Sequence, residues 1–287
     1  MSTKEIGFIG AGKIGEPMVE RLLAAGYVTT VYARRQDVRD RLAAQGAAIA
    51  SEPDDLAQAD IVIACLFSDS QVLEVCPPIV SRMRAGGVFV SHTTGSPTTI
   101  RRLAAIGGDR GISVVEAPFS GNPAAIRRGD LTVLLAGDAA AVGSTAGVLS
   151  AYSSNVVRIG QLGTAQPAKL LNNALFAACT QLTLAALQTA GSLGVPERTF
   201  LDVLAVSSGG SAAAQYISAS GQSALTYSGQ LPRYLTKDLD SVRAVAAELD
   251  LDISTLLSAA ERGPMDLAGQ DDLTLGHRWP TPDLRES

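Results

Sequence analysis

The chain has 287 residues, of which 46% are hydrophobic, and its formal net charge is −5 at pH 7. This length and apolar content suffice for one large domain or two moderate ones. An acidic chain lacks the positive charge with which proteins bind nucleic acid or an anionic membrane surface. We therefore expect neither nucleic acid nor a membrane among its partners.

Cysteines and termini point to a reducing compartment. The three cysteines are too few and too scattered for a disulfide framework or a metal cluster. Residues 1–5 lead directly into an apolar strand and do not resemble a signal peptide, and we expect no apolar stretch long and uncharged enough to cross a bilayer. Paired carboxylates such as Asp54 and Asp55 have no His or Cys at ligand spacing, so no metal site is predicted. The predicted location is the cytoplasm.

The first motif is a glycine-rich turn after the apolar run Gly7–Ile9. Gly10 allows the tight turn from strand to helix, Gly12 lets the backbone approach a pyrophosphate, and Gly15 lets helix and strand pack closely. The helix that follows adds partial positive charge at its N-terminus. The alternative is a plain strand-turn-helix unit. The order of strand, glycines and helix favours a dinucleotide site lined by Gly10, Ala11, Gly12, Lys13, Ile14 and Gly15.

The end of the next predicted strand, residues 28–32, indicates which dinucleotide binds. An Asp or Glu at this point usually holds the ribose 2′-hydroxyl, whereas a 2′-phosphate calls for guanidinium groups. The chain has Arg34 and Arg35 there and no acidic residue. NADP(H) is therefore favoured over NAD(H); the alternative is a solvated basic pair at the end of a strand.

Two patterns divide the chain near residue 160. Before it, short β-rich runs alternate with helical runs, which predicts a Rossmann-type, doubly wound parallel α/β sheet. After it, an all-α domain is predicted, beginning with one long interdomain helix over residues 165–193. The predicted domains are an NADP-binding domain (1–160) and a helical domain for substrate binding and oligomerisation (161–287). Further strands are expected at 61–65, 88–90, 112–115 and 131–135, and further helices at 196–206, 211–220, 235–249 and 253–262.

Lys169 is the candidate proton donor. Hydride transfer to a carbonyl needs a group that protonates the oxygen, and the histidines are poor candidates because His92 follows a buried strand and His277 lies in the tail. Lys169 stands near the start of the long helix, where a cleft between two domains would open. Asn172 and Asn173 lie within one helical turn of it. The alternative is a surface lysine beside amides that bond to backbone.

Four blocks resemble the β-hydroxyacid dehydrogenases, a family that includes 3-hydroxyisobutyrate dehydrogenase and the tartronate semialdehyde, succinic semialdehyde and glyoxylate reductases. In chain order they are Gly7 to Gly15, Glu116 to Asn122 followed by Gly129-Asp130-Leu131, Gly160 to Asn173, and Lys237-Asp238-Leu239. Together they span most of the chain, which is more specific than any one of them.

The resemblance implies a role for each matching residue. Lys169 would be the catalytic general acid/base, and Lys237 would approach the cofactor. Thr94 would lie beside the nicotinamide ribose, with Leu66 and Phe67 flanking the dinucleotide. The residues that would hold the substrate are Ser120, Gly121 and Asn173, joined by Asn122, because a Ser-Gly-Asn turn offers a hydroxyl, a backbone amide and a side-chain amide to a carboxylate.

The chain also departs from the family pattern. The family usually has Asp in place of Ser91 and Glu116, Pro in place of Phe67, and Gly in place of Asn122 and Ala165. No departure removes a proposed catalytic group, but those at Phe67 and Asn122 change the lining of the cleft and the edge of the cofactor site.

The predicted function is hydride transfer between NADP(H) and a short β-hydroxy acid or its semialdehyde. Two alternatives remain: an imine reductase acting on C=N substrates, and a non-catalytic NADP-binding member of the same fold. The retained Lys169 favours the first reading over both. The Ala-rich long helix favours a homodimer or homotetramer, although Ala also reflects helix propensity alone.

Overall fold

The computed structural model describes residues 4–267. By its internal contacts the chain divides into two compact units, residues 1–170 and 171–287. The division falls inside one long helix, whereas the sequence analysis places the domain boundary at residue 160. That boundary stays a prediction. His277 lies outside the described residues.

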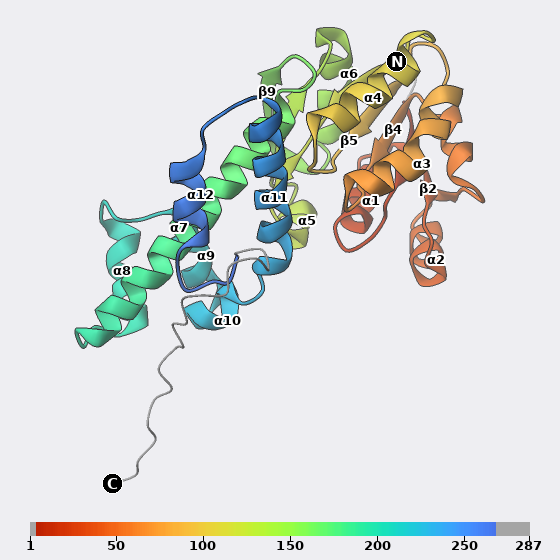
Figure 1. Cartoon of the computed structure of the whole chain (residues 1–287). Helices are drawn as coiled ribbons and strands as arrows, with labels where there is room; N and C mark the ends of the chain where they lie inside the picture. Colours follow the sequence, from red (N-terminus) through yellow and green to blue (C-terminus); the bar gives the residue numbers. More distant parts are fainter. Residues whose placement is uncertain (1–3, 268–287) are drawn as a thin grey trace. The chain divides into compact units, whose positions relative to one another are not determined.

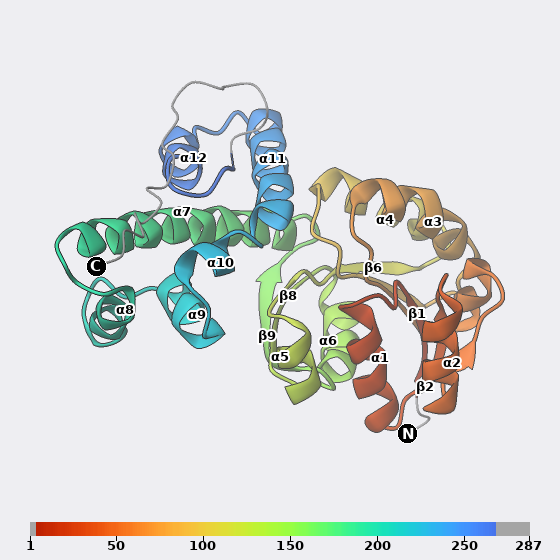
Figure 2. The ribbon, with the colours of Figure 1, turned by 90° about the horizontal axis from the view of Figure 1, so that it is seen from below.

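The first unit is a nine-stranded sheet with helices on both faces, as Figures 1 and 2 show for the part of the chain described. Its strands are β1 (Glu5–Ile9), β2 (Val28–Tyr32), β3 (Ala48–Ile49), β4 (Ile61–Ala64), β5 (Val88–Ser91), β6 (Ser113–Glu116), β7 (Phe119–Ser120), β8 (Leu131–Ala136) and β9 (Ser153–Gly160). Its helices are α1 (Gly15–Ala24), α2 (Gln36–Ala44), the 3₁₀ helix η1 (Pro53–Gln58), α3 (Asp69–Arg82), α4 (Pro97–Gly108), α5 (Pro123–Arg128) and α6 (Ala139–Leu149).

The sheet runs in the order β3-β2-β1-β4-β5-β6-β8-β7, with β9 paired to β8. The pairs from β3 to β6 are all parallel, which confirms the predicted Rossmann-type fold. β8 departs from it, since it pairs antiparallel with β6 and β7. Only residues 121–130 lie between β7 and β8, and this connection is shorter than the crossover of about a dozen or more residues that a parallel neighbour needs.

Two buried clusters hold this sheet between its helices. One joins the sheet to α1, α2, α5 and α6 and includes Phe8, Met18 and Tyr152. The other joins the opposite face to η1, α3 and α4 and includes Phe89, Ile79 and Met83. Strands buried on both faces read as continuous apolar runs, which is why β1, β4 and β5 are predictable from the sequence.

The register brings several strand ends to one edge. Ile9 at the end of β1 pairs with Tyr32 of β2 and with Ala64 of β4. Ser91 of β5 pairs with Glu116 of β6. Because the carboxyl ends of parallel strands meet at the same edge, the segments that follow these strands are neighbours, and ligands of such sheets bind there.

The second unit is helical. It contains most of α7 (Ala165–Ser192), followed by α8 (Glu197–Val206), α9 (Ala212–Ser220), α10 (Ala224–Ser228), α11 (Pro232–Glu248) and α12 (Ser254–Glu261). In Figure 2, α11 and α12 lie along one side of α7, and α8, α9 and α10 along the other. The helical character of this half of the chain agrees with the sequence prediction.

The sequence analysis expects no apolar stretch long enough to cross a bilayer, and by length and composition alone α7 contradicts that expectation. This 28-residue helix is apolar enough to cross a membrane, with a mean hydropathy of 1.4 over its most apolar window. Half of that window is buried inside the protein, and the helix carries buried polar side chains such as Gln166 and Gln181. The core helix of a soluble protein meets the same criterion, so this helix is weak grounds for a membrane span.

Candidate active site

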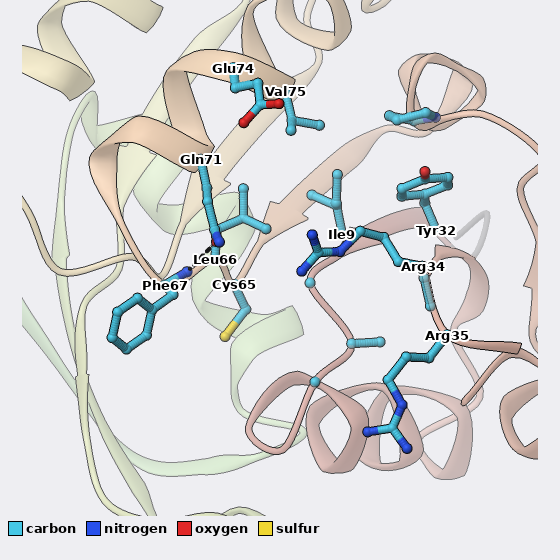
Figure 3. Close-up of a pocket in the computed structure, with 15 residues that line it drawn as sticks. Ile9, Tyr32, Arg34, Arg35, Cys65, Leu66, Phe67, Gln71, Glu74 and Val75 are labelled. Carbon is cyan, nitrogen blue, oxygen red and sulfur yellow. Dashed lines mark hydrogen bonds between the residues drawn. The ribbon is translucent and has the colours of Figure 1, made fainter. Parts of the chain in front are cut away.

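A pocket of about 490 Å³ lies where β1, β2 and β4 end. Figure 3 shows the side chains that surround it. It is lined by Ile9, Gly10, Ala11, Gly12, Tyr32, Ala33, Arg34, Arg35, Pro53, Cys65, Leu66, Phe67, Gln71, Glu74 and Val75. The structure thus brings the first glycines of the motif, the arginine pair and the Leu66-Phe67 pair of the sequence analysis to one place.

Glycine is needed at the three positions of the motif for different local reasons. Gly10 has a φ of +96°, and a Cβ there would lie 2.2 Å from the carbonyl oxygen of Cys65. A Cβ at Gly15 would lie 2.2 Å from the carbonyl oxygen of Gly10. At Gly12, by contrast, nothing lies within 4 Å of the added atom. Two glycines are therefore required by packing, and the third leaves open space at the pocket wall.

The helix after this turn can receive an anion. The N-cap residue of α1, Ile14, makes no side-chain capping bond to the first turn. The first amides of a helix need acceptors, and they carry the positive end of the helix dipole. With the open space at Gly12, these groups fit the pyrophosphate of a dinucleotide. Lys13 is exposed on the same turn, and neither Lys13 nor Ile14 lines the pocket.

The two arginines after β2 differ although they are adjacent. Arg35 donates to both carboxylate oxygens of Asp37, from Nε at 2.9 Å and Nη2 at 2.5 Å. Asp37 also accepts from Arg41, and these arginines lower the pKa of its carboxyl to about 2. Arg34 instead extends across the pocket toward Ile9, as Figure 3 shows. Of the pair, Arg34 has its guanidinium group directed into the pocket.

The opposite wall is provided by the segment after β4 and by α3. The amide of Phe67 donates to Oε1 of Gln71 at 3.0 Å. Gln71 and Glu74 lie one helical turn apart on α3 and both line the pocket. The sequence analysis misses these two residues. Gln71 and Glu74 follow the Ser68 N-cap at intervals of three residues, which places them on one face of α3; this spacing is the sequence signal that could identify them.

A buried histidine joins the ends of β5 and β6. His92 Nδ1 lies 2.5 Å from the carbonyl oxygen of Ala117, and its Nε2 lies 2.8 Å from the hydroxyl of Tyr152. A carbonyl only accepts, so Nδ1 carries the proton and Nε2 accepts from the tyrosine. Burial lowers the pKa of His92 to about 4. His92 is therefore a neutral structural group, as expected, and it fixes the backbone just before Phe119 and Ser120.

The Ser120–Asn122 turn follows β7. Ser120 is half-buried, and Gly121 has a φ of +138° with no room for a Cβ, which would lie 2.5 Å from the Leu131 side chain. Asn122 is the N-cap of α5, and its Oδ1 accepts from the amide of Ala125 at 2.9 Å. This capping bond uses the carboxamide oxygen of Asn122 and not its Nδ2 group.

Lys169 lies in the first turns of α7, within the first unit, and is buried, with 7% of its surface exposed. A lysine is rarely buried unless it has a partner, and Lys169 is not without one. Glu116, Thr93 and Gly95, at the ends of β6 and β5, all bond to residues 163–166 of the same segment. The helix that carries Lys169 therefore begins at the edge of the sheet where β5 and β6 end.

In the second unit, Asn173 and Lys237 meet through an acidic side chain. Asn173 Nδ2 donates to Oδ2 of Asp238 at 2.6 Å, and Lys237 Nζ lies 3.7 Å from Oδ1 of the same residue. Asp238 is buried, and the sequence analysis gives it no role of its own. Among residues 4–267, no group of three or more His, Cys, Asp or Glu side chains could hold a metal ion.

Comparisons with known protein families cover both units. Residues 5–160 match the NAD binding domain of 6-phosphogluconate dehydrogenase. Residues 163–271 match the family described as NAD-binding of NADP-dependent 3-hydroxyisobutyrate dehydrogenase. Together the matches extend over most of the sequence. They support the binding of a nicotinamide cofactor independently of the glycine motif.

Individual relatives agree with these matches. The chain is 32% identical to an NAD-dependent L-serine dehydrogenase of Pseudomonas aeruginosa over 72% of this chain and 71% of that protein. It is 31% identical to the mitochondrial 3-hydroxyisobutyrate dehydrogenase of Mus musculus over 72% of this chain and 63% of that protein. A structure of Mycobacterium tuberculosis 3-hydroxyisobutyrate dehydrogenase with L-serine has a TM-score of 0.81 at 23% identity, covering 91% of this chain and 92% of that one. This structural likeness concerns the fold.

Proposed function

Because the chain belongs to the β-hydroxyacid dehydrogenase family of nicotinamide-dependent oxidoreductases, we propose that it transfers a hydride between NADP(H) and a short β-hydroxy acid or its semialdehyde. The observation that carries this proposal is the buried amine of Lys169 on a helix that starts at the carboxyl edge of the sheet. A cation buried beside a cofactor-binding edge is suited to proton transfer.

In this proposal Lys169 is the general acid/base. When bound, the reduced nicotinamide supplies the hydride to the carbonyl carbon. Lys169, as an ammonium, polarises the carbonyl oxygen and protonates it, and as a neutral amine it accepts the hydroxyl proton in the reverse direction. Proton transfer by a positioned side chain typically contributes about 10²–10⁴-fold in rate.

The proposed substrate group is a carboxylate with an oxygen on its β-carbon. L-serine and 3-hydroxyisobutyrate, which name two relatives, share this arrangement. The hydroxyl of Ser120, the amide of Gly121 and Nδ2 of Asn122 would hold the carboxylate. From the second unit, the family likeness adds Asn173 to the substrate-binding residues and Lys237 to the cofactor-binding residues.

The proposed cofactor is NADP(H), and Arg34 supports it. Its guanidinium reaches into the pocket, and no acidic residue follows β2 to hold a ribose hydroxyl before Asp37, which is occupied by Arg35 and Arg41. The proposed cofactor-binding residues also include Gly10, Ala11, Gly12, Lys13, Ile14, Gly15, Leu66, Phe67 and Thr94. The Pseudomonas relative is NAD-dependent by name, so the preference needs a direct comparison of NADPH and NADH.

A homodimer or homotetramer in the cytoplasm completes the proposal. Leu171, Leu175 and Leu182 on α7 are each about half exposed or more, at 48%, 57% and 62%. Contact with a second copy of the chain would bury these exposed leucines. The free state of all three cysteines agrees with a reducing compartment.

The test is oxidation of NADPH across a panel of glyoxylate, succinic semialdehyde, related short semialdehydes and cyclic imines. Turnover of a semialdehyde is expected, together with a loss of about 10²-fold or more in kcat for Lys169→Ala and unchanged NADPH affinity. Lys4→Ala, which removes a lysine that donates to the Ser144 carbonyl, is the control and keeps full activity.

Three outcomes would contradict the proposal. Near-normal turnover by Lys169→Ala removes the general acid/base. Turnover confined to the imines identifies an imine reductase. NADPH binding with no turnover on any compound identifies a non-catalytic member of the fold.

A further inference from the structure

A cluster of buried polar groups surrounds the start of α7 and is not explained by packing. Glu116 and Gln166 are both essentially inaccessible to solvent, with 0% and 1% of their surfaces exposed. Burying a carboxylate and a carboxamide is costly unless their polar atoms find partners. The partners they find are backbone groups of two segments next to the proposed chemistry.

Glu116 caps the helix that carries Lys169. Its carboxylate accepts from the amide of Gly163 at 2.5 Å and from the amide of Gln166 at 3.2 Å. The first amides of a helix have no partner within the helix, and Pro167 has no N–H group to satisfy. The first helical bond then follows, from Ala168 to the carbonyl of Thr164 at 3.3 Å. A side chain from the sheet therefore sets where α7 begins.

Gln166 extends from this helix to the segment after β5. Its Oε1 accepts from the amide of Gly95 at 3.0 Å, and its Nε2 donates to the carbonyl of Thr93 at 2.8 Å. The two backbone groups flank Thr94, which the family likeness places beside the nicotinamide ribose. One carboxamide thus forms hydrogen bonds with the backbone on both sides of Thr94.

Asp69 holds the same segment from α3. Its Oδ2 accepts from the amide of Ser96 at 2.8 Å. A Cβ at Gly95 would lie 2.2 Å from Oδ1 of Asp69, so the segment is packed directly against this carboxylate. The backbone of residues 93–96 is therefore fixed from α3 and from α7, and the α7 contact comes from the helix that carries Lys169.

We infer that Gln166 is a positioning residue that sets the Thr94 segment in register with Lys169, three residues further along the same helix. Glu116 supports it by fixing the start of that helix. The inference rests on the proposed function, in which Thr94 faces the nicotinamide end of the cofactor and Lys169 the reacting oxygen. A catalytic pair held by one rigid element keeps its geometry without needing contact between its members.

The test compares two buried glutamines on α7. Gln166→Met keeps the volume of the side chain and removes both hydrogen bonds. Gln181→Met is the matched control, because Gln181 also bonds backbone at both ends, to the amide of Met265 at 2.8 Å and to the carbonyl of Met265 at 2.8 Å, in the second unit. For each variant the measurements are kcat, the Kd of NADPH, and the Kd of 2′,5′-ADP, which has the adenosine half of the cofactor and no nicotinamide.

Gln166→Met is expected to raise the Kd of NADPH by about fivefold or more and to lower kcat by about tenfold or more, because two buried bonds are lost beside the nicotinamide end. Its Kd for 2′,5′-ADP is expected to stay within about twofold of the wild-type value, since that half of the pocket is untouched. Gln181→Met is expected to reduce stability and to leave both dissociation constants and kcat within about twofold.

An unchanged ratio of the NADPH and 2′,5′-ADP dissociation constants in Gln166→Met would overturn the inference, whether neither constant changes or both rise by the same factor. The binding ratio needs no turnover, so it still tests Gln166 if the wild-type protein proves inactive and the proposed function fails. If Gln166→Met does not fold, Gln166→Glu replaces it: this change retains the acceptor for Gly95 and loses the donor to Thr93, and the same ratio decides.

Discussion

The two units build their candidate functional groups in different ways. In residues 1–170, the pocket is shaped largely by backbone: a glycine turn, the ends of parallel strands and the start of a helix. In residues 171–287, the candidate groups are side chains on two helices, where Asn173 of α7 and Lys237 of α11 meet at Asp238. A site built from backbone restricts which residue types fit its conformation. A cluster of side chains places no such restriction on the backbone that carries it.

This difference determines what a substitution does. At a backbone site, adding a single carbon atom collides with main-chain atoms that cannot move. At a side-chain cluster, removing one group leaves a partner short of a hydrogen bond while the helices stay in place. Changes in the first unit should therefore affect folding and binding most, and changes in the second should be milder.

The largest effect is expected from Gly10→Ala. Its new Cβ would lie 2.2 Å from a carbonyl oxygen at a φ of +96°. We expect a loss of about 3 kcal/mol or more in the free energy of unfolding, measured with urea, and no NADPH binding. Gly12→Ala is the control, since nothing lies within 4 Å of its Cβ. It should keep stability within about 1 kcal/mol and raise the Kd of NADPH about tenfold. Equal stability of the two variants would contradict the backbone account.

The next effect is a pH dependence of stability in the first unit. Burial lowers the pKa of His92 to about 4, while an unfolded histidine titrates near 6.5. Between these values the unfolded state binds more protons, so stability rises with pH and is lost as the pH falls from 6.5 to 4. The loss should reach about 3 kcal/mol relative to His92→Gln, which does not titrate. Tyr152→Phe keeps the imidazole and should keep the slope. Parallel curves for wild type and His92→Gln in urea titrations would refute the assignment.

A smaller effect separates two adjacent arginines. Arg34→Ala is expected to raise the Kd of NADPH by about 10–100-fold, because bonds between charged groups are the strong ones, and to leave the Kd of NADH within about threefold. Arg35→Ala should change either constant less than about threefold, since its guanidinium is already paired with Asp37. Calorimetric titration with each cofactor measures both. Tighter binding of NADH than NADPH by the wild-type protein would exclude the NADP preference.

The smallest effect belongs to the second unit. Asn173→Ala removes the 2.6 Å bond to Asp238, which Lys237 continues to partner. We expect a loss of about 1 kcal/mol in the free energy of unfolding. Asn172→Ala, at an exposed neighbour, should change it by less than about 0.5 kcal/mol. If Asn173→Ala destabilises the protein as much as Gly10→Ala does, the contrast between the two units fails.

The same contrast explains what the sequence could predict. The strands β1, β2, β4, β5, β6 and β8 are apolar runs, and their positions follow from composition. The strands β3 and β7 have two residues each, and β9 is largely exposed and polar, so none gives a clear periodic signal. The five-residue helix α10 is likewise too short for a helical pattern to identify it.

For the candidate site, glycines and arginines are found by their chemistry alone. Lys169 and Asn173 stand out by their spacing on an apolar helix, and the family pattern gives them a role; Lys237 stands out only through that pattern. The sequence marks Glu116 only as a departure from the family pattern and gives no sign of a role for Gln166, because their partners are backbone groups about 50 and 70 residues away. A hydrogen bond from a side chain to a distant main chain leaves no periodicity and no local motif, so only the folded structure reveals it.

The cysteines have a practical consequence. Burial raises the pKa of the Cys65 and Cys76 thiols to about 12, which suppresses the reactive thiolate form of both at neutral pH. Cys179, half-buried on α7, is the remaining cysteine of the chain. A maleimide dye should therefore attach at Cys179 faster than at Cys65 or Cys76. Energy transfer from the fluorescence of bound NADPH to such a dye would follow the helical unit during cofactor binding in the native protein.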